Sequence, residues 1–237
     1  MAQPQMPAAT NWRFDVDFER IAWLTIDTPN SPVNTLSRIA ITELETIILR
    51  VEDLIASGEV VGLVIQSGKD SGFIAGADVS EFDAMSDPAI LPDALKRAHA
   101  VLDRIEKLKA PVVAAIHGFA LGGGLETAMA CNYRIAKKST KVGLPEVLIG
   151  ILPGGAGTQR LPRLVGPKIA LDMITSGRHV PAEEAKGYGI LDALVDDKAD
   201  LRAEAIKFAK SIADKRPMPV VSQMTTKFDE YKNDPGI

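Results

Sequence analysis

Cysteine is almost absent from the sequence, since Cys131 is the only one among 237 residues. A single cysteine excludes a disulfide framework and any cysteine-based zinc site. The three histidines, His99, His117 and His179, lie far apart without metal-ligand spacing, so we expect no metal centre. Aromatic residues make up only 5% of the chain, but hydrophobic residues make up 46%. The chain therefore has enough aliphatic material for a packed core, which excludes a disordered protein.

An excess of positive charge is also missing, because 27 basic residues against 31 acidic ones give a formal net charge of −4. This balance lacks the electrostatic signature of a protein that binds nucleic acid or an anionic membrane. No apolar run reaches the roughly 18 residues of a membrane span. Residues 1–10 lack the features of a signal peptide, and residues 235–237 are not a peroxisomal signal. We therefore expect a cytoplasmic protein with no nucleic-acid or membrane partner.

Strands and helices alternate along the chain, which is typical of the α/β class. The strands are expected at residues 12–18, 21–26, 60–66, 112–116, 133–136 and 191–195. The helices are expected between a cap at Ser37 or Thr42 and Gly58, and at residues 93–108, 125–130, 167–175, 181–186 and 201–215. A strand, a glycine-containing turn and a helix occur twice, over residues 60–85 and 112–130. No linker composition requires a second domain.

The strongest functional signal is a run of three glycines, 122–124, between a buried strand and a short helix. The first N–H groups of a helix have no partner within it and carry the positive end of its dipole. Gly123 is therefore placed to donate its N–H to a developing negative oxygen. A second glycine turn, 75–77, follows the preceding strand, and two such donors would form an oxyanion hole. The alternative is that the three glycines form only a tight turn.

Two glutamates accompany the glycine run. Glu126 lies one turn into the short apolar helix, where it either is buried for a catalytic purpose or compensates the helix dipole on a solvated face. Glu146 is flanked by apolar residues, and Pro145 before it predicts an extended approach. Burial would raise the pKa of its carboxyl, which suits acid–base chemistry. The alternative is a loop carboxylate paired with Arg160 or Arg163.

Other motifs of nucleotide and hydrolase sites are missing. Residues 154–157 read Gly-Gly-Ala-Gly. They do not continue into the third glycine of the dinucleotide motif Gly-x-Gly-x-x-Gly, and the acidic residue that follows this motif is also missing. Neither a phosphate-binding loop nor a Gly-x-Ser-x-Gly nucleophile turn is present. We expect His117 and Cys131 to be structural. Asp78 either compensates a helix start or contacts substrate.

Four segments together resemble the crotonase superfamily, and specifically its enoyl-CoA hydratases. They are SPVNTLS (31–37), FIAGADVSEF (73–82), GFALGGGLETAMACNYRIA (118–136) and KVGLPEVLIGILPGGAGTQRLPRLVG (141–166). Their order and spacing agree with the family over about residues 12–195. Within the superfamily, these segments are most similar to the amino-terminal hydratase part of multifunctional β-oxidation enzymes. In those proteins a hydroxyacyl-CoA dehydrogenase part follows, and this chain shows no trace of it.

The resemblance implies a fold and a set of functional residues. The fold is a spiral of stacked ββα turns, with a catalytic core over residues 1–195 and a helical carboxyl-terminal segment of the same domain over residues 196–237. Ala77 and Gly123 would donate N–H groups to the thioester oxygen, and the catalytic carboxylates would be Glu126 and Glu146. The substrate-binding residues would be Val33, Ala75, Gly76, Asp78, Gly122, Pro145 and Gly154.

The implied activity is hydration of trans-2-enoyl-CoA to 3-hydroxyacyl-CoA in fatty acid β-oxidation, with Δ3-Δ2-enoyl-CoA isomerization as a side activity. The backbone around Val33 and Ala75 would lie along the adenine and pantetheine of the substrate's CoA. No metal or redox cofactor is implied. The expected assembly is a homotrimer or hexamer, or else docking with the dehydrogenase part of a longer chain. The alternatives are a non-catalytic acyl-CoA-binding module and a thioester hydrolase on the same scaffold.

Overall fold

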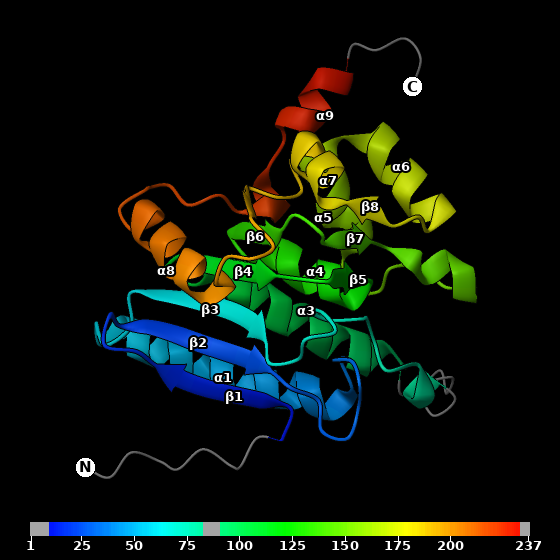
Figure 1. The fold of residues 1–237 in the computed structure, drawn as a ribbon. Helices are drawn as coiled ribbons and strands as arrows, with labels where there is room; N and C mark the ends of the chain where they lie inside the picture. The colour runs from blue at the N-terminus through cyan, green and yellow to red at the C-terminus, as the bar shows by residue number, and fades with distance from the viewer. Residues whose placement is uncertain (1–9, 83–90, 233–237) are drawn as a thin grey trace.

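Two sheets form the frame of the molecule, and a computed structural model describes residues 10–82 and 91–232 of it (Figure 1). The six-stranded sheet has the order β1 (Trp12–Val16), β2 (Ile21–Ile26), β3 (Gly62–Ser67), β4 (Val112–Ile116), β6 (Tyr133–Lys137) and β9 (Ala193–Val195). The three-stranded sheet has the order β5 (Phe119–Leu121), β7 (Lys141–Gly143) and β8 (Val180–Pro181). Pairing is parallel throughout except at β1–β2 and β7–β8.

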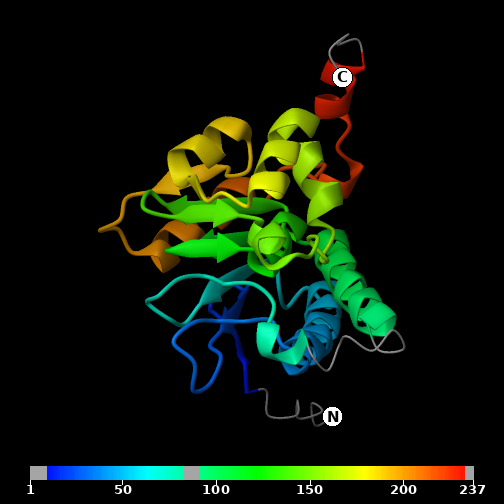
Figure 2. The same cartoon turned by 90° about the vertical axis from the view of Figure 1, so that its right-hand side faces the viewer.

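Helices cover both faces of the larger sheet (Figures 1 and 2). The α-helices are α1 (Arg38–Ala56), α3 (Leu91–Lys107), α4 (Gly123–Ala130), α5 (Gly157–Val165), α6 (Pro167–Ser176), α7 (Ala182–Tyr188), α8 (Leu201–Ile212) and α9 (Thr226–Tyr231). Three short 3-10 helices are η1 (Val79–Glu81), η2 (Pro145–Ile149) and η3 (Val221–Gln223). Within residues 10–82 and 91–232, no helix is long and apolar enough to cross a membrane.

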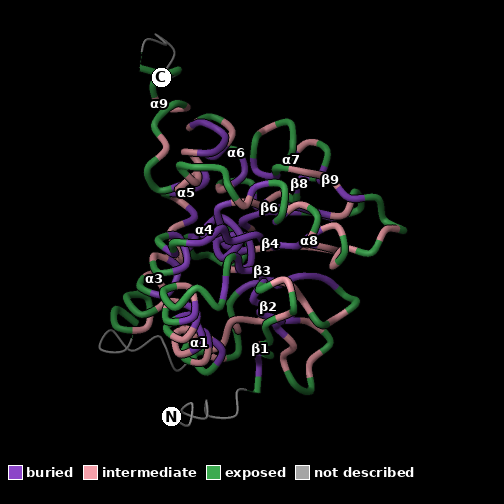
Figure 3. Tube along the Cα trace, turned by 90° about the vertical axis from the view of Figure 1, so that its left-hand side faces the viewer, coloured by how far each residue is buried: buried purple, intermediate pink, exposed green. Residues whose placement is uncertain are grey.

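Strand β2 shows that the sheet is buried on both sides, since all six of its residues are buried. Alternate side chains of a strand point to opposite faces. Leu24 accordingly joins the large core beneath α1, α3 and α4, whereas Trp23 joins a smaller core beneath α8. The buried trace in Figure 3 follows these strands and α4 through the centre of the molecule.

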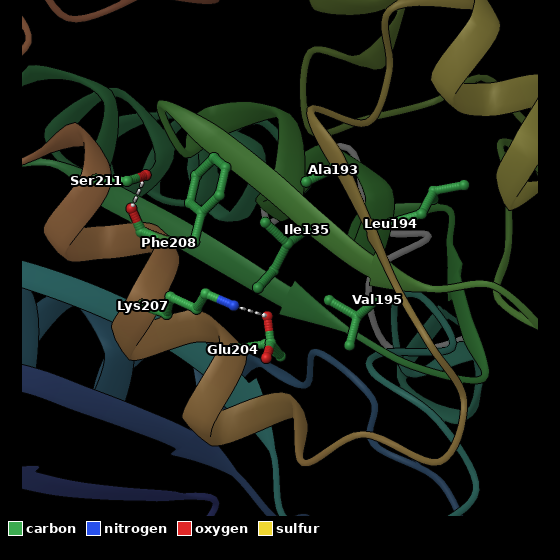
Figure 4. A pocket seen from close by; sticks show the side chains of 8 residues that line it. All are labelled: Ile135, Ala193, Leu194, Val195, Glu204, Lys207, Phe208 and Ser211. Atoms are coloured by element: carbon green, nitrogen blue, oxygen red, sulfur yellow. Dashed lines mark hydrogen bonds and ion pairs between the residues drawn. The ribbon is translucent and has the colours of Figure 1, made fainter.

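A shallow cavity of about 200 Å³ lies between α8 and strands β6 and β9 (Figure 4). Apolar side chains such as Ile135, Val195 and Phe208 line it, and Glu204 pairs with Lys207 at its edge. None of the residues expected to carry the chemistry contributes to this cavity.

The start of α4 rests directly on the segment that follows β3. The N–H of Leu121 donates to the carbonyl oxygen of Ile74 at 3.0 Å, and Ile74 bridges Ala120 in parallel. A Cβ at Gly124 would overlap that same carbonyl oxygen of Ile74. This close approach brings the two glycine turns, one after β3 and one after β4, to the same place.

Most elements expected from hydrophobic patterning are confirmed, with boundaries shifted by a few residues. The strand expected over residues 12–18 ends at Val16, and the helix expected from Leu125 already begins at Gly123. Pro145 does not make an extended approach as expected, because it opens the 3-10 helix η2 at a position where proline's fixed φ suits a helix start. The division of the chain at residue 195 stays a prediction. Residues 1–9, where the sequence lacks the features of a signal peptide, lie outside the described residues.

The Gly124→Ala substitution tests the packing of α4. Because the added methyl would overlap the Ile74 carbonyl, we expect the free energy of unfolding to fall by about 1–3 kcal/mol. Gly187 in α7 is the matched control, since a Cβ there meets nothing within 4 Å. Gly187→Ala should stabilise the protein by roughly 0.5–1 kcal/mol. Urea unfolding of both variants measures the difference, and equal stabilities would contradict the packing described here.

Candidate active site

Two backbone N–H groups, of Ala77 and Gly123, come together at the start of α4. A Cβ built on Gly123 would lie 3.6 Å from the nitrogen of Ala77. Within the described residues, neither N–H donates a backbone hydrogen bond to the fold. Gly122 precedes the helix with a φ of +51°, which L-residues rarely adopt, and it turns the chain sharply into α4. Two unused donors therefore lie close together at the start of α4, where the helix dipole is positive.

Glu126 lies one turn into α4 and is buried, with only 3% of its surface exposed. Its Oε1 accepts the N–H of Gly157 at 2.7 Å, and Gly157 opens helix α5. Burial raises the pKa of the Glu126 carboxyl, while the N–H groups of Gly157 and Gly155 oppose that rise. Its carboxylate is therefore not a dipole-compensating group on a solvated face.

Glu146 in η2 has a buried carboxyl, and among the described residues its Oε2 has no hydrogen-bond partner. Burial raises its pKa to about 7, and the neighbouring charge of Glu126 contributes to the rise. The expected alternative, a pairing with Arg160 or Arg163, is wrong. Arg160 instead binds Asp103 and Glu106, and Arg163 donates to the carbonyl oxygens of Ser222 and Gln159.

The two carboxyls lie against the same glycine-rich backbone. A Cβ at Gly122 would stand 3.0 Å from Oε1 of Glu146, and a Cβ at Gly157 would stand 2.8 Å from Oε1 of Glu126. Glycine is required at these positions because a side chain would fill the space of the acids. The carboxyl of Glu126, which accepts an N–H group, therefore lies close to the carboxyl of Glu146, whose Oε2 has no partner among the described residues.

The remaining predicted site residues lie in the turns around this centre. The carbonyl of Val33 accepts the Ser31 hydroxyl, the N–H of Ala75 donates to Asn34, and the carbonyl of Gly76 accepts the N–H of Leu36. Asp78 caps η1 by accepting the N–H and hydroxyl of Ser80, which agrees with a role at a helix start. The carbonyl of Gly154 lies 2.5 Å from Nε2 of His99. Direct contact of these residues with substrate stays a prediction.

The contacts of His117 and Cys131 agree with the structural roles expected for them. His117 bonds the carbonyl of Lys69 through Nε2, and Cys131 is buried. Burial raises the pKa of the Cys131 thiol to about 12. In the described part of the chain, no three acidic, histidine or cysteine side chains gather in a way that could hold a metal ion.

Sequence reasoning missed the contacts made by residues 154–157. That stretch was rejected as a nucleotide site and its Gly154 was expected to bind substrate, but its Gly157 also supplies the donor to Glu126 from 31 residues away. It also missed the buried ion pair between Arg160 and Glu106, whose other oxygen accepts the N–H of Ser222. The glycine spacing was the available signal, but the sequence did not show which acid those glycines contact.

Comparison with known proteins identifies the family. A model of the family described as enoyl-CoA hydratase/isomerase matches residues 18–235. The chain belongs to the enoyl-CoA hydratase/isomerase family. The resemblance seen in the sequence is thereby confirmed.

Curated relatives are longer than this chain. The fatty acid oxidation complex subunit alpha of Vibrio parahaemolyticus is 43% identical over 185 residues, which are 77% of this chain and 26% of the relative. The subunit of the same name from Shewanella amazonensis is 41% identical over 212 residues, 89% of this chain and 29% of the relative. The chain thus spans about a quarter of the length of the curated relatives it matches.

Similar solved structures confirm the expected crotonase-type fold. An enoyl-CoA hydratase from Bacillus anthracis superposes with a TM-score of 0.79 and 33% identity, covering 86% of this chain and 77% of that one. Pseudomonas aeruginosa DspI superposes with a TM-score of 0.81 and 31% identity, covering 91% of this chain and 79% of that one.

The ionisation of Glu146 gives a pH-dependent stability that can be tested. Its folded pKa of about 7 lies above its ordinary value of 4.5, so the folded state favours the protonated form. The contribution of Glu146 to the free energy of unfolding is then fully present below about pH 4.5. It is lost as the pH rises to about 7, which lowers the free energy of unfolding by up to about 3 kcal/mol. Glu146→Gln removes this loss, so the variant should gain stability over the parent as the pH increases.

Urea unfolding at about pH 5 and about pH 8.5 measures this effect. Glu183→Gln on the exposed surface of α7 is the control and should show no such trend. A stability difference between Glu146→Gln and the parent that is the same at both pH values would contradict the burial of an ionisable acid here.

Proposed function

We propose that this chain catalyses the addition of water across the double bond of a trans-2-enoyl-CoA thioester, giving 3-hydroxyacyl-CoA in fatty acid β-oxidation. The observation that carries the proposal is the placement of two buried carboxyls, Glu126 and Glu146, beside the unused N–H groups of Ala77 and Gly123. Membership of the family and the names of the relatives support it.

The two N–H groups supply electrostatic stabilisation. A thioester carbonyl conjugated to a double bond is a weak electrophile, and negative charge collects on its oxygen when a nucleophile attacks C3. Donors from Ala77 and Gly123 stabilise that enolate-like charge, and they are held by the backbone before the reaction begins. Loss of one such donor typically costs about 3 kcal/mol of transition-state stabilisation.

The two glutamates perform the proton transfers. Together they orient the attacking water and take one of its protons as the C3–O bond forms, and Glu146 delivers a proton to C2. The number of protons on the pair is unchanged at the end of the reaction. A carboxyl whose pKa is about 7 can both accept and donate a proton near neutral pH. This chemistry requires neither a metal nor a redox cofactor.

The substrate's CoA would follow the turns that lead to the two donors. Val33 and Ala75 would lie along its adenine and pantetheine, and the turns at Gly76, Asp78, Gly122, Pro145 and Gly154 would bound the acyl end. We infer that the protein works as a homotrimer or hexamer, or docked to a dehydrogenase part. The name of the relatives, subunit alpha of a complex, supports a partnered role.

Isomerization of a 3-enoyl-CoA to the 2-enoyl-CoA is a second candidate activity. It moves one proton from C2 to C4, so a single acid–base group near its working pH suffices. Glu146 has that property, and its Oε2 is not occupied by another group of the described chain.

Substitution of each glutamate separates these activities. Glu146→Gln should lower hydration of crotonyl-CoA by at least about 10²-fold and should abolish isomerization as well. Glu126→Gln should lower hydration to a similar extent but retain isomerization. Loss of enoyl absorbance measures hydration, and Glu183→Gln on the surface is the control.

Three outcomes would contradict the proposal or the role it gives to Glu146. Binding of acyl-CoA without any turnover by the unaltered protein would identify a binding module. Release of free thiol in place of hydration would identify a thioester hydrolase. Full hydration activity in Glu146→Gln would refute the role of that residue.

A further inference from the structure

Residues 154–157 form a loop that lies between Glu126 on one side and His99 on the other. His99 is half-buried on α3, and its Nε2 approaches the carbonyl oxygen of Gly154 at 2.5 Å. A carbonyl oxygen can only accept, so Nε2 carries the hydrogen and His99 is the donor. On the opposite side, the N–H of Gly157 is bound to Oε1 of Glu126.

A single peptide group lies between His99 and the second oxygen of Glu126. The carbonyl of Gly154 and the N–H of Gly155 belong to the same planar unit and point in opposite directions. The atom that a Cβ at Gly155 would meet first is Oε2 of Glu126, and the N–H of Gly155 counts among the groups that stabilise the charged form of this acid. A donor on the carbonyl polarises the peptide and strengthens donation from its N–H.

Arg160 fixes the next peptide of the loop. Its Nη1 lies 3.4 Å from the carbonyl of Gly155, while Nη2 is held by Asp103 and Glu106 of α3. The titratable and charged groups that act on Glu126 are Glu146 from η2, Arg160 from α5 and His99 from α3. The carbonyl oxygens of Gly154 and Gly155 are thus both linked to α3, the first directly by His99 and the second through Arg160. Helix α3 therefore holds the loop against Glu126.

We propose that His99 is a positioning residue for Glu126, acting through the peptide group between Gly154 and Gly155. The imidazole holds that peptide so that its N–H faces Oε2, and with Gly157 it fixes the orientation of the carboxylate toward the attacking water. His99 does not touch the substrate in this role. The kinetic consequence rests on the proposed hydratase function.

His99→Leu and His99→Gln test the inference, because leucine cannot donate to the carbonyl and glutamine can. We expect kcat for hydration to fall by about 10- to 100-fold in His99→Leu, with KM within about twofold of the parent. His99→Gln should recover most of the loss. Lys96→Leu, an exposed position one turn earlier on α3, is the control and should keep the parent's kcat.

The pH profile distinguishes positioning from packing. N–H donors favour the charged form of a carboxyl, so weakening the Gly155 donor raises the pKa of Glu126. The acid limb of kcat/KM should therefore move to higher pH in His99→Leu and stay near the parent's position in His99→Gln. Unchanged kcat and acid limb in a folded His99→Leu, or equal losses in both variants, would overturn the inference.

Amide NMR separates this inference from the proposed function. The Gly155 amide proton should shift upfield both in His99→Leu and in Glu126→Gln, because each change weakens the hydrogen bond it makes. If the parent protein hydrates no enoyl-CoA but both shifts occur, the proposed function fails and the positioning contact stands. If the parent is active but His99→Leu leaves the Gly155 resonance unmoved, the positioning role is wrong.

Discussion

The first turn of helix α4 is the constraint on which the site depends. Gly122 adopts a positive φ, and α4 begins at the next residue, so the N–H of Gly123 has no partner within the helix. Glu126 lies three residues later, which returns its carboxyl to the same end of the helix. A helix start thus supplies a positive donor and an acid from five consecutive residues. The segment that carries Ala77 and the short helix that carries Glu146 are both packed against this turn.

The difference between the two acids follows from what the backbone offers each of them. Burying a carboxylate is costly unless hydrogen bonds replace its water. Glu126 receives the N–H of Gly157, whereas Oε2 of Glu146 receives nothing from the described chain, and burial then raises the pKa of Glu146 to about 7. Environments that differ between neighbouring carboxyls create an acid and a base from the same residue type. The glycines at 122, 155 and 157 are needed because their missing side chains leave room for these acids.

Local sequence patterns predicted those features of the fold and site that neighbouring residues in the chain determine. The buried strands, the amphipathic helices and the N–H of Gly123 follow from hydrophobic periodicity and from the strand–glycine–helix order. Strand β5 was not predicted, because three residues are too short for alternation to show. The sequence left open a pairing of Glu146 with Arg160 as an alternative, but folding brings the buried Glu106 of α3 within 3.1 Å of Arg160 instead. Long-range choices of this kind depend on how helices pack, which a single sequence does not encode locally.

The most direct test of the account is the state of the thioester carbonyl when it is bound. Crotonyl-CoA labelled with ¹³C at C1 can be observed by NMR on the Glu146→Gln variant, where we expect hydration to be at least about 10²-fold slower. If the N–H groups of Ala77 and Gly123 bind the oxygen, the C1 resonance will move downfield from its position in water, because two fixed donors polarise the carbonyl more strongly than solvent does. A bound substrate whose C1 resonance equals that in water would contradict the account.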